Sequence, residues 1–133
     1  AAAHPRAAAP PGPSAHDIAS EGGLTPLHRM RGLARSGGAP FLVRASGSGL
    51  GLAAALHLLA SGADFGTLED VSASNPLSQS LAAPRPVPDA QGLLHVPEGP
   101  GLGVVPDPET LRLNVHPVKI ERAARVIFQQ PAP

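Results

Sequence analysis

Apolar stretches of strand length alternate with segments of helix length in residues 25–82, and this alternation limits the fold more than any other feature. The predicted order is helix, strand, helix, strand, helix, at residues 25–36, 40–44, 50–60, 65–68 and 76–82. The strand at 40–44 contains a short continuous apolar run, Phe41, Leu42 and Val43, as is typical of a buried parallel strand. Strands that alternate with helices at this spacing predict an α/β chain built from parallel βα units.

The first predicted helix has signals at both ends. Thr25 is expected to be its N-cap, with Pro26 at the first helical position, and Gly37 and Gly38 to end it. Its predicted apolar face is Leu27, Met30, Leu33 and Ala34. The second helix is rich in Ala and Leu all round, which predicts that it is buried.

The two ends of the chain differ from this regular part. Residues 1–16 are mostly Ala and Pro, and the Pro-Pro-Gly-Pro run within them predicts a disordered or polyproline-like arm. Residues 84–133 are predicted to form an extension of turns. Within it, the apolar pairs around residues 118–120 and 126–128 predict a hairpin that turns at residues 122–125.

Composition excludes several kinds of function. Ten basic and ten acidic residues give zero formal net charge, which predicts no binding to nucleic acid or to an anionic membrane surface. Cys is absent, so disulfides and thiol chemistry are excluded. No apolar run approaches the roughly twenty residues of a membrane-spanning helix. We therefore expect a cytoplasmic protein. Only three Phe and no Trp or Tyr predict a weak fold in isolation.

Five motifs follow one another in an order that resembles a known family. They are an Asp-X-X-X-X-Gly-Gly-Leu-Thr segment from Asp17 to Thr25, Gly-Ser-Gly-Leu-Gly at 47–51, a strand ending at Glu69, Asn-Pro-Leu at 75–77, and Val-Pro-Glu-Gly-Pro-Gly-Leu-Gly-Val at 96–104. This order resembles the C-terminal end of the mandelate racemase and muconate-lactonizing branch of the enolase superfamily.

The resemblance implies an incomplete C-terminal portion of a (β/α)7β TIM-like barrel with an irregular C-terminal extension. A chain of 133 residues is far shorter than the roughly 250 residues of a complete barrel. Residues 17–83 are expected to be the last βα units, after the arm at 1–16 and before the extension at 84–133. In the family, the strand before the Asp17 position carries that carboxylate, and we expect this strand to be lost here. The family's extension packs on a separate N-terminal capping domain.

The resemblance also implies two candidate catalytic residues. Asp17 matches the family's Asp that orients a catalytic His on the next strand, and Glu69 matches an acidic residue at the end of the last strand that binds the substrate carboxylate. Counting back from the helix puts Arg44 in the position of that His. Because Arg stays protonated at neutral pH, the expected general base is missing. The alternative for Asp17 is a solvated residue before a Gly-rich turn, and for Glu69 a surface charge.

Besides the general base, the chain is expected to lack the metal-binding residues of the family. Intact relatives bind Mg²⁺ through carboxylates on three earlier strands and use it to abstract a proton next to a carboxylate, as sugar-acid dehydratases or racemases do. The partner implied is thus an acid-sugar or other carboxylate substrate, used by a lyase or isomerase. For this chain alone we expect no cofactor, no activity, and self-association through the exposed barrel edge.

Two other functions stay open. Gly47, Gly49 and Gly51 follow a strand and open a helix, with Glu69 about twenty residues on, as in a dinucleotide-binding fold. The fingerprint Gly-X-Gly-X-X-Gly is not complete, however. The third function is a non-catalytic fragment that only associates with other subunits. Six His residues lack the short spacing of a metal site, and His57, amid Leu and Ala, is interpreted as structural.

Overall fold

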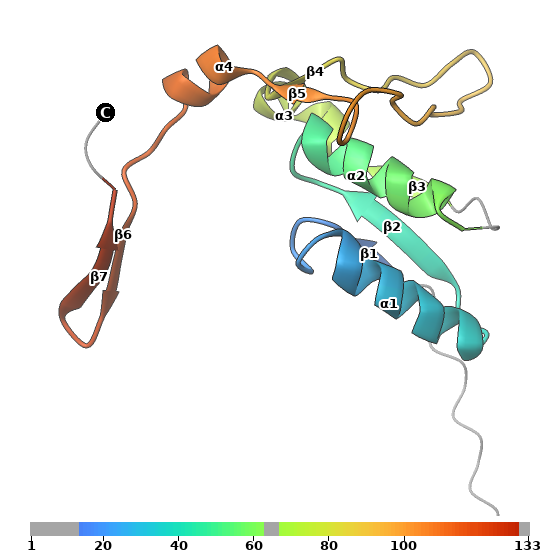
Figure 1. Ribbon diagram of the computed structural model, residues 1–133, viewed down its shortest axis with the longest axis horizontal. Helices are drawn as coiled ribbons and strands as arrows, with labels where there is room; N and C mark the ends of the chain where they lie inside the picture. The colour runs from blue at the N-terminus through green and yellow to red at the C-terminus, as the bar shows by residue number, and fades with distance from the viewer. Residues whose placement is uncertain (1–13, 63–66, 131–133) are drawn as a thin grey trace, which may run out of the picture.

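The computed structural model describes residues 14–62 and 67–130 (Figure 1). Its first sheet has three parallel strands in the order β1-β2-β3, which are β1 (Ser14–Asp17), β2 (Phe41–Ala45) and β3 (Leu68–Asp70). The connecting helices are α1 (Leu24–Ser36) and α2 (Gly49–Ala60), and both pack on one face of the sheet (Figure 1). The predicted parallel βα units, and with them the α/β fold class, are confirmed. The second predicted strand, at 65–68, begins outside the described residues, and the strand found there is Leu68–Asp70.

The core lies between this sheet and its two helices. Its fully buried members come from each layer, with Leu27 from α1, Val43 from β2 and Leu52 from α2. Leu33, predicted on the buried face of α1, is 75% exposed, whereas Leu27 on the same predicted face is fully buried, so only part of that face packs in the core. The side chains of Leu42 and Arg44 alternate with Val43 along the strand and stay half-exposed on the other face of the sheet.

The strand before Asp17 is present, and the expectation that it was lost is wrong. Residues 14–17 pair in parallel with residues 41–44, so the last three residues assigned to the disordered arm belong to the sheet. Local propensity gives no hint of this strand, since pairing with β2 decides it. The rest of the arm, residues 1–13, lies outside the described residues.

Helix α1 begins one residue before the predicted N-cap. Gly22 and Gly23 have φ of 88° and 93°, a region that favours glycine, and the helix starts at Leu24 with Gly23 as its N-cap. Thr25 is therefore inside the first turn and does not cap it. Pro26 is tolerated there because the first N–H groups of a helix have no partner within it. Gly37 ends the helix as predicted.

The segment after β3 consists of short elements. They are η1 (Ser72–Ser74), α3 (Pro76–Ser80), β4 (Ala82–Ala83), β5 (Val105–Pro106) and α4 (Pro108–Leu113). Asn75 caps α3, its Oδ1 accepting from the amides of Leu77 and Ser78. β4 pairs antiparallel with β5, so the loop of residues 84–104 returns to the domain. The boundary at residue 83 stays a prediction.

A hairpin ends the described chain. It consists of β6 (Lys119–Arg122) and β7 (Arg125–Gln129), as the sequence predicted, and it lies apart from the parallel sheet (Figure 1). Within the ranges that the structure describes, no helix is long and apolar enough to cross a membrane.

Candidate functional site

The candidate catalytic residues form one row across the parallel sheet. Asp17 on β1 is the register partner of Arg44 on β2, and Arg44 is the register partner of Glu69 on β3. Register partners in parallel strands point their side chains to the same face. The three side chains predicted from the sequence are thus brought to one face, near the carboxyl ends of the strands, where barrel enzymes place their chemistry.

Arg44 and Glu69 form an ion pair within this row. Arg44 Nε donates to Glu69 Oε2 at 2.8 Å, and the two side chains are 40% and 43% exposed. Glu69 was predicted at the end of the strand, but β3 continues to Asp70, so Glu69 lies in its middle. The pair holds the Glu69 carboxylate against a cation that cannot serve as a base at neutral pH.

Asp17 is buried and hydrogen-bonded, so the interpretation of a solvated residue is wrong. Only 9% of it is exposed. Its carboxylate accepts from Ala19 N, Ser20 N and Ser20 Oγ at 3.0 to 3.2 Å, and from Ser46 N at 3.0 Å. Burial acts to raise the pKa of Asp17, but the hydrogen bonds from Ser46, Ser20 and Ala19 outweigh it, and the net pKa is lowered.

These contacts give Asp17 a structural task. The bonds to Ala19 and Ser20 close the turn after β1, while the bond to Ser46 joins that turn to the end of β2. In the predicted dyad, this carboxylate would instead hold an imidazole on the neighbouring strand. Here Arg44 occupies that strand position and turns to Glu69.

The described residues do not fit the Mg²⁺ that the resemblance implies. A hard divalent cation needs several converging oxygen ligands. No group of three or more His, Asp or Glu residues that could hold a metal occurs within 14–62 and 67–130. The two carboxylates of the row are already engaged, Asp17 by backbone amides and Glu69 by Arg44.

A second polar network beside the row was not found from the sequence. Asp70 Oδ2 accepts from Arg85 Nη2 at 2.6 Å, and Ser72 Oγ bridges the same two side chains. Only 15% of the Arg85 side chain and 21% of the Asp70 side chain are exposed. The sequence offered one signal for this network: because Asp70 follows Glu69 in a strand, its side chain must point to the opposite face of the sheet.

This network gives a prediction. Arg85→Ala is expected to lower the free energy of unfolding by about 1–2 kcal/mol, because it leaves the largely buried Asp70 carboxylate without its cation; the value is below the usual cost for a fully buried pair. Urea unfolding followed by circular dichroism measures it.

The control is Arg112→Ala in α4, which breaks an ion pair with Glu109 whose side chains are 68% and 61% exposed. No change is expected there, since exposed pairs contribute little. Equal losses in the two variants would contradict the structural role of Arg85.

The glycine at the first position of α2 is explained by packing. A Cβ on Gly49 would lie 3.4 Å from the Cβ and the carbonyl oxygen of Ala82, so a small residue allows β4 to approach the helix. Ser48 caps the helix, its Oγ accepting from Gly51 N at 3.5 Å. Thus Gly49 has a packing role that does not involve the pyrophosphate of a dinucleotide. His57 Nε2 lies 3.3 Å from the carbonyl oxygen of Leu102, which confirms its structural interpretation.

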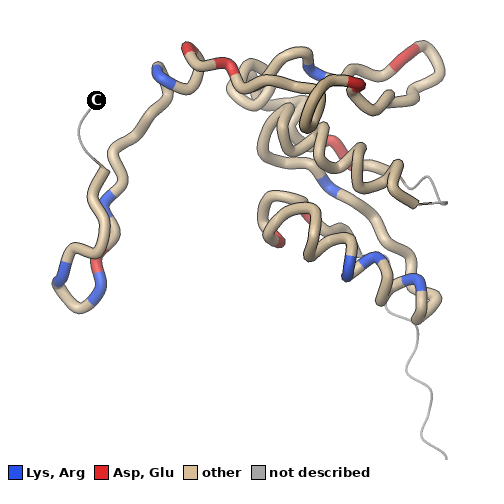
Figure 2. Tube along the Cα trace, viewed as in Figure 1, with Lys and Arg blue, Asp and Glu red and all other residues tan. Residues whose placement is uncertain are grey.

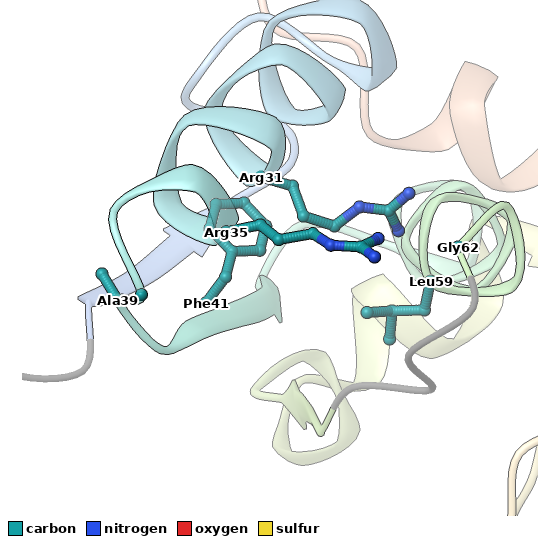
Figure 3. A pocket seen from close by; sticks show the side chains of 7 residues that line it. Arg31, Arg35, Ala39, Phe41, Leu59 and Gly62 are labelled. Atoms are coloured by element: carbon teal, nitrogen blue, oxygen red, sulfur yellow. The ribbon is translucent and has the colours of Figure 1, made fainter.

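A pocket of about 310 Å³ lies at the opposite end of the strands, between the C-terminal ends of α1 and α2 (Figure 3). Arg31 and Arg35 both reach across it toward α2. Arg31 donates to the carbonyl oxygen of Leu58 at 2.5 Å and to Ser61 Oγ at 3.2 Å. These bonds satisfy a helix C-terminus, where a cation is favourable. This pocket is therefore a packing feature of the helix ends.

Parallel βα units with a polar row near the carboxyl ends of the strands define a section of a βα-barrel protein. The chain belongs to the enolase C-terminal domain-like family, whose model matches residues 15–110. It is also similar to the crystal structure of a predicted mandelate racemase from Rhodobacter sphaeroides, with 29% identity and a TM-score of 0.66 over 84% of this chain. The chain covers only 28% of that protein. No curated protein matches the chain significantly.

Proposed function

We propose that this chain is the C-terminal section of an enolase-superfamily enzyme that abstracts a proton next to a carboxylate with the help of Mg²⁺, and that the 133 residues alone are inactive. A sugar-acid dehydratase or a racemase is the proposed class. The family match and the 28% coverage of the racemase neighbour support the first part. The Arg44–Glu69 ion pair supports the second part, the lack of activity, because Arg44 occupies the position where the resemblance requires a general base.

Substrate and cofactor belong to the same proposal. The substrate is an acid sugar or another α-hydroxy carboxylate. Mg²⁺ held by a full set of carboxylate ligands would stabilise the negative charge that develops when the proton is lost. Within the described residues Asp17 and Glu69 have other partners, so those ligands come from other parts of an intact enzyme. The cytoplasmic location and the association through the outer strands β1 and β3 stay predictions.

Exchange of the substrate α-proton tests the proposal. The purified chain is incubated with Mg²⁺ and mandelate, or with a panel of sugar acids, in D₂O, and proton NMR follows the α-proton signal. We expect no exchange for the chain, and none for Arg44→His, because a restored imidazole still lacks a metal. An intact mandelate racemase is the positive control. Exchange by the 133-residue chain would contradict the proposal.

Thermal unfolding separates the proposed function from the dinucleotide alternative. We expect that neither Mg²⁺ with an α-hydroxy acid nor NAD or FAD raises the melting temperature of the chain. Stabilisation by Mg²⁺ with the acid would indicate a surviving enolase-type site, and retention of a nucleotide would favour the dinucleotide interpretation.

A further inference from the structure

The C-terminal hairpin exposes apolar side chains on a structure that is marginal by itself. Every residue of β6 and β7 is exposed, and Ile120, Ile127 and Phe128 are 50%, 62% and 51% exposed. The turn residues Ala123 and Ala124 have φ of 50° and 62°, a region that alanine adopts at a cost. An isolated two-stranded hairpin is at best marginally stable in water, so a partner that pairs with it would stabilise it.

The outer edge of β6 is complementary to itself. If two copies pair antiparallel about a two-fold axis at Ile120, each Lys119 stands opposite Glu121 of the second copy. Lys119 and Glu121 point to the same face, since their side chains already pair at 2.5 Å within one strand. Opposite charges directly across two antiparallel strands stabilise the pairing. Figure 2 shows both basic and acidic residues along this hairpin.

The apolar face of the hairpin continues across such a pairing. Ile120 is the register partner of Phe128 within the hairpin. When two β6 edges pair, Ile120 of one copy contacts Ile120 of the other. The four strands then carry a continuous row of Phe128, Ile120, Ile120 and Phe128. The edge of β7 offers no such match, because β7 contains Arg125 and no acidic residue. The charges of Lys119 and Glu121 therefore favour pairing through the β6 edge over the β7 edge.

We propose that β6 is a self-association edge, through which two copies of this chain form a two-fold symmetric, four-stranded antiparallel sheet. The interface is isologous, since the same residues of each copy meet. This proposal concerns the hairpin alone and does not depend on the enzymatic function proposed above.

Charge exchange between Lys119 and Glu121 tests the proposal. Lys119→Glu places two acidic residues on each edge, and Glu121→Lys places two basic ones. Sedimentation velocity over a range of concentrations should show a monomer–dimer equilibrium for the original chain. In each single variant we expect dimerisation to weaken by about tenfold, because two attractive pairs become repulsive.

An equimolar mixture of the two single variants provides the decisive comparison. All cross-strand charges are then opposite, so we expect a heterodimer at least as stable as the original dimer. The double variant Lys119→Glu/Glu121→Lys also restores every pair and should dimerise like the original chain. Loss of the charge pair within one strand cannot explain recovery in the mixture, because both variants still lack that pair.

Two outcomes would overturn the proposal. One is a chain that stays monomeric at all concentrations, which would leave the hairpin for another occupant, such as a capping domain. The other is association that is equal in all variants, as expected for pairing through the edges of β1 or β3. Circular dichroism of each variant checks that the exposed substitutions leave the fold unchanged.

Discussion

Leu52→Ala is expected to lower the free energy of unfolding by about 3–4 kcal/mol and to leave the chain largely unfolded. Leu52 is fully buried in α2, within the cluster that joins both helices to the sheet. Removing its side chain loses the transfer free energy of the deleted atoms and leaves a cavity. Among the residues that the structure describes, the largest fully buried side chains are Leu27, Leu52, Val43 and Ser72. A core this small offers little to compensate.

Leu33→Ala in α1 is the matched control, since the same atoms are removed from a side chain that is 75% exposed. We expect a change within about 0.5 kcal/mol. Urea unfolding of both variants, followed by far-ultraviolet circular dichroism, makes the comparison. Similar losses at the two positions would mean that the core does not lie between α2 and the sheet.

The regular part of the fold could be predicted because local signals and packing agree there. The apolar run around Val43 is a buried strand, and the Ala- and Leu-rich segment is the buried helix α2. The hairpin turn was also predicted, from two apolar stretches around four residues. By contrast, residues 14–17 carry no β-branched side chain, and they form a strand because β2 offers a paired edge.

The residues of the candidate site could be located from the sequence, but the pairing of their side chains could not be predicted. Motif order placed Asp17, Arg44 and Glu69 near strand ends, and the register of the three strands brings them into one row. Which of these residues pair depends on side-chain geometry, and the sequence did not indicate that Arg44 would form an ion pair with Glu69. The contact of Asp70 with Arg85, fifteen residues apart, depends on the path of the chain after α3.

Asp17→Asn is expected to lower the free energy of unfolding by about 2–3 kcal/mol at pH 7, although the shape of the side chain is unchanged. Oδ2 accepts from Ser46 N, and Oδ1 accepts from the amides of Ala19 and Ser20. An Asn can satisfy only one of these sides, since its amide nitrogen is a donor, and hydrogen bonds to a charged acceptor are the stronger ones. Glu98→Gln, at an exposed carboxylate, is the control and should change little.

The pH dependence distinguishes this charged role from simple shape filling. The pKa of Asp17 is lowered in the folded state, so its contribution to stability is fully present above the unfolded pKa of about 3.8. That contribution is lost as the pH falls through the lower, folded pKa. The difference in unfolding free energy between the original chain and Asp17→Asn should therefore be constant near neutral pH and shrink in acid. If this difference in unfolding free energy stays constant down to the lowest pH at which the chain folds, the negative charge of Asp17 does not stabilise the contact between β1 and β2.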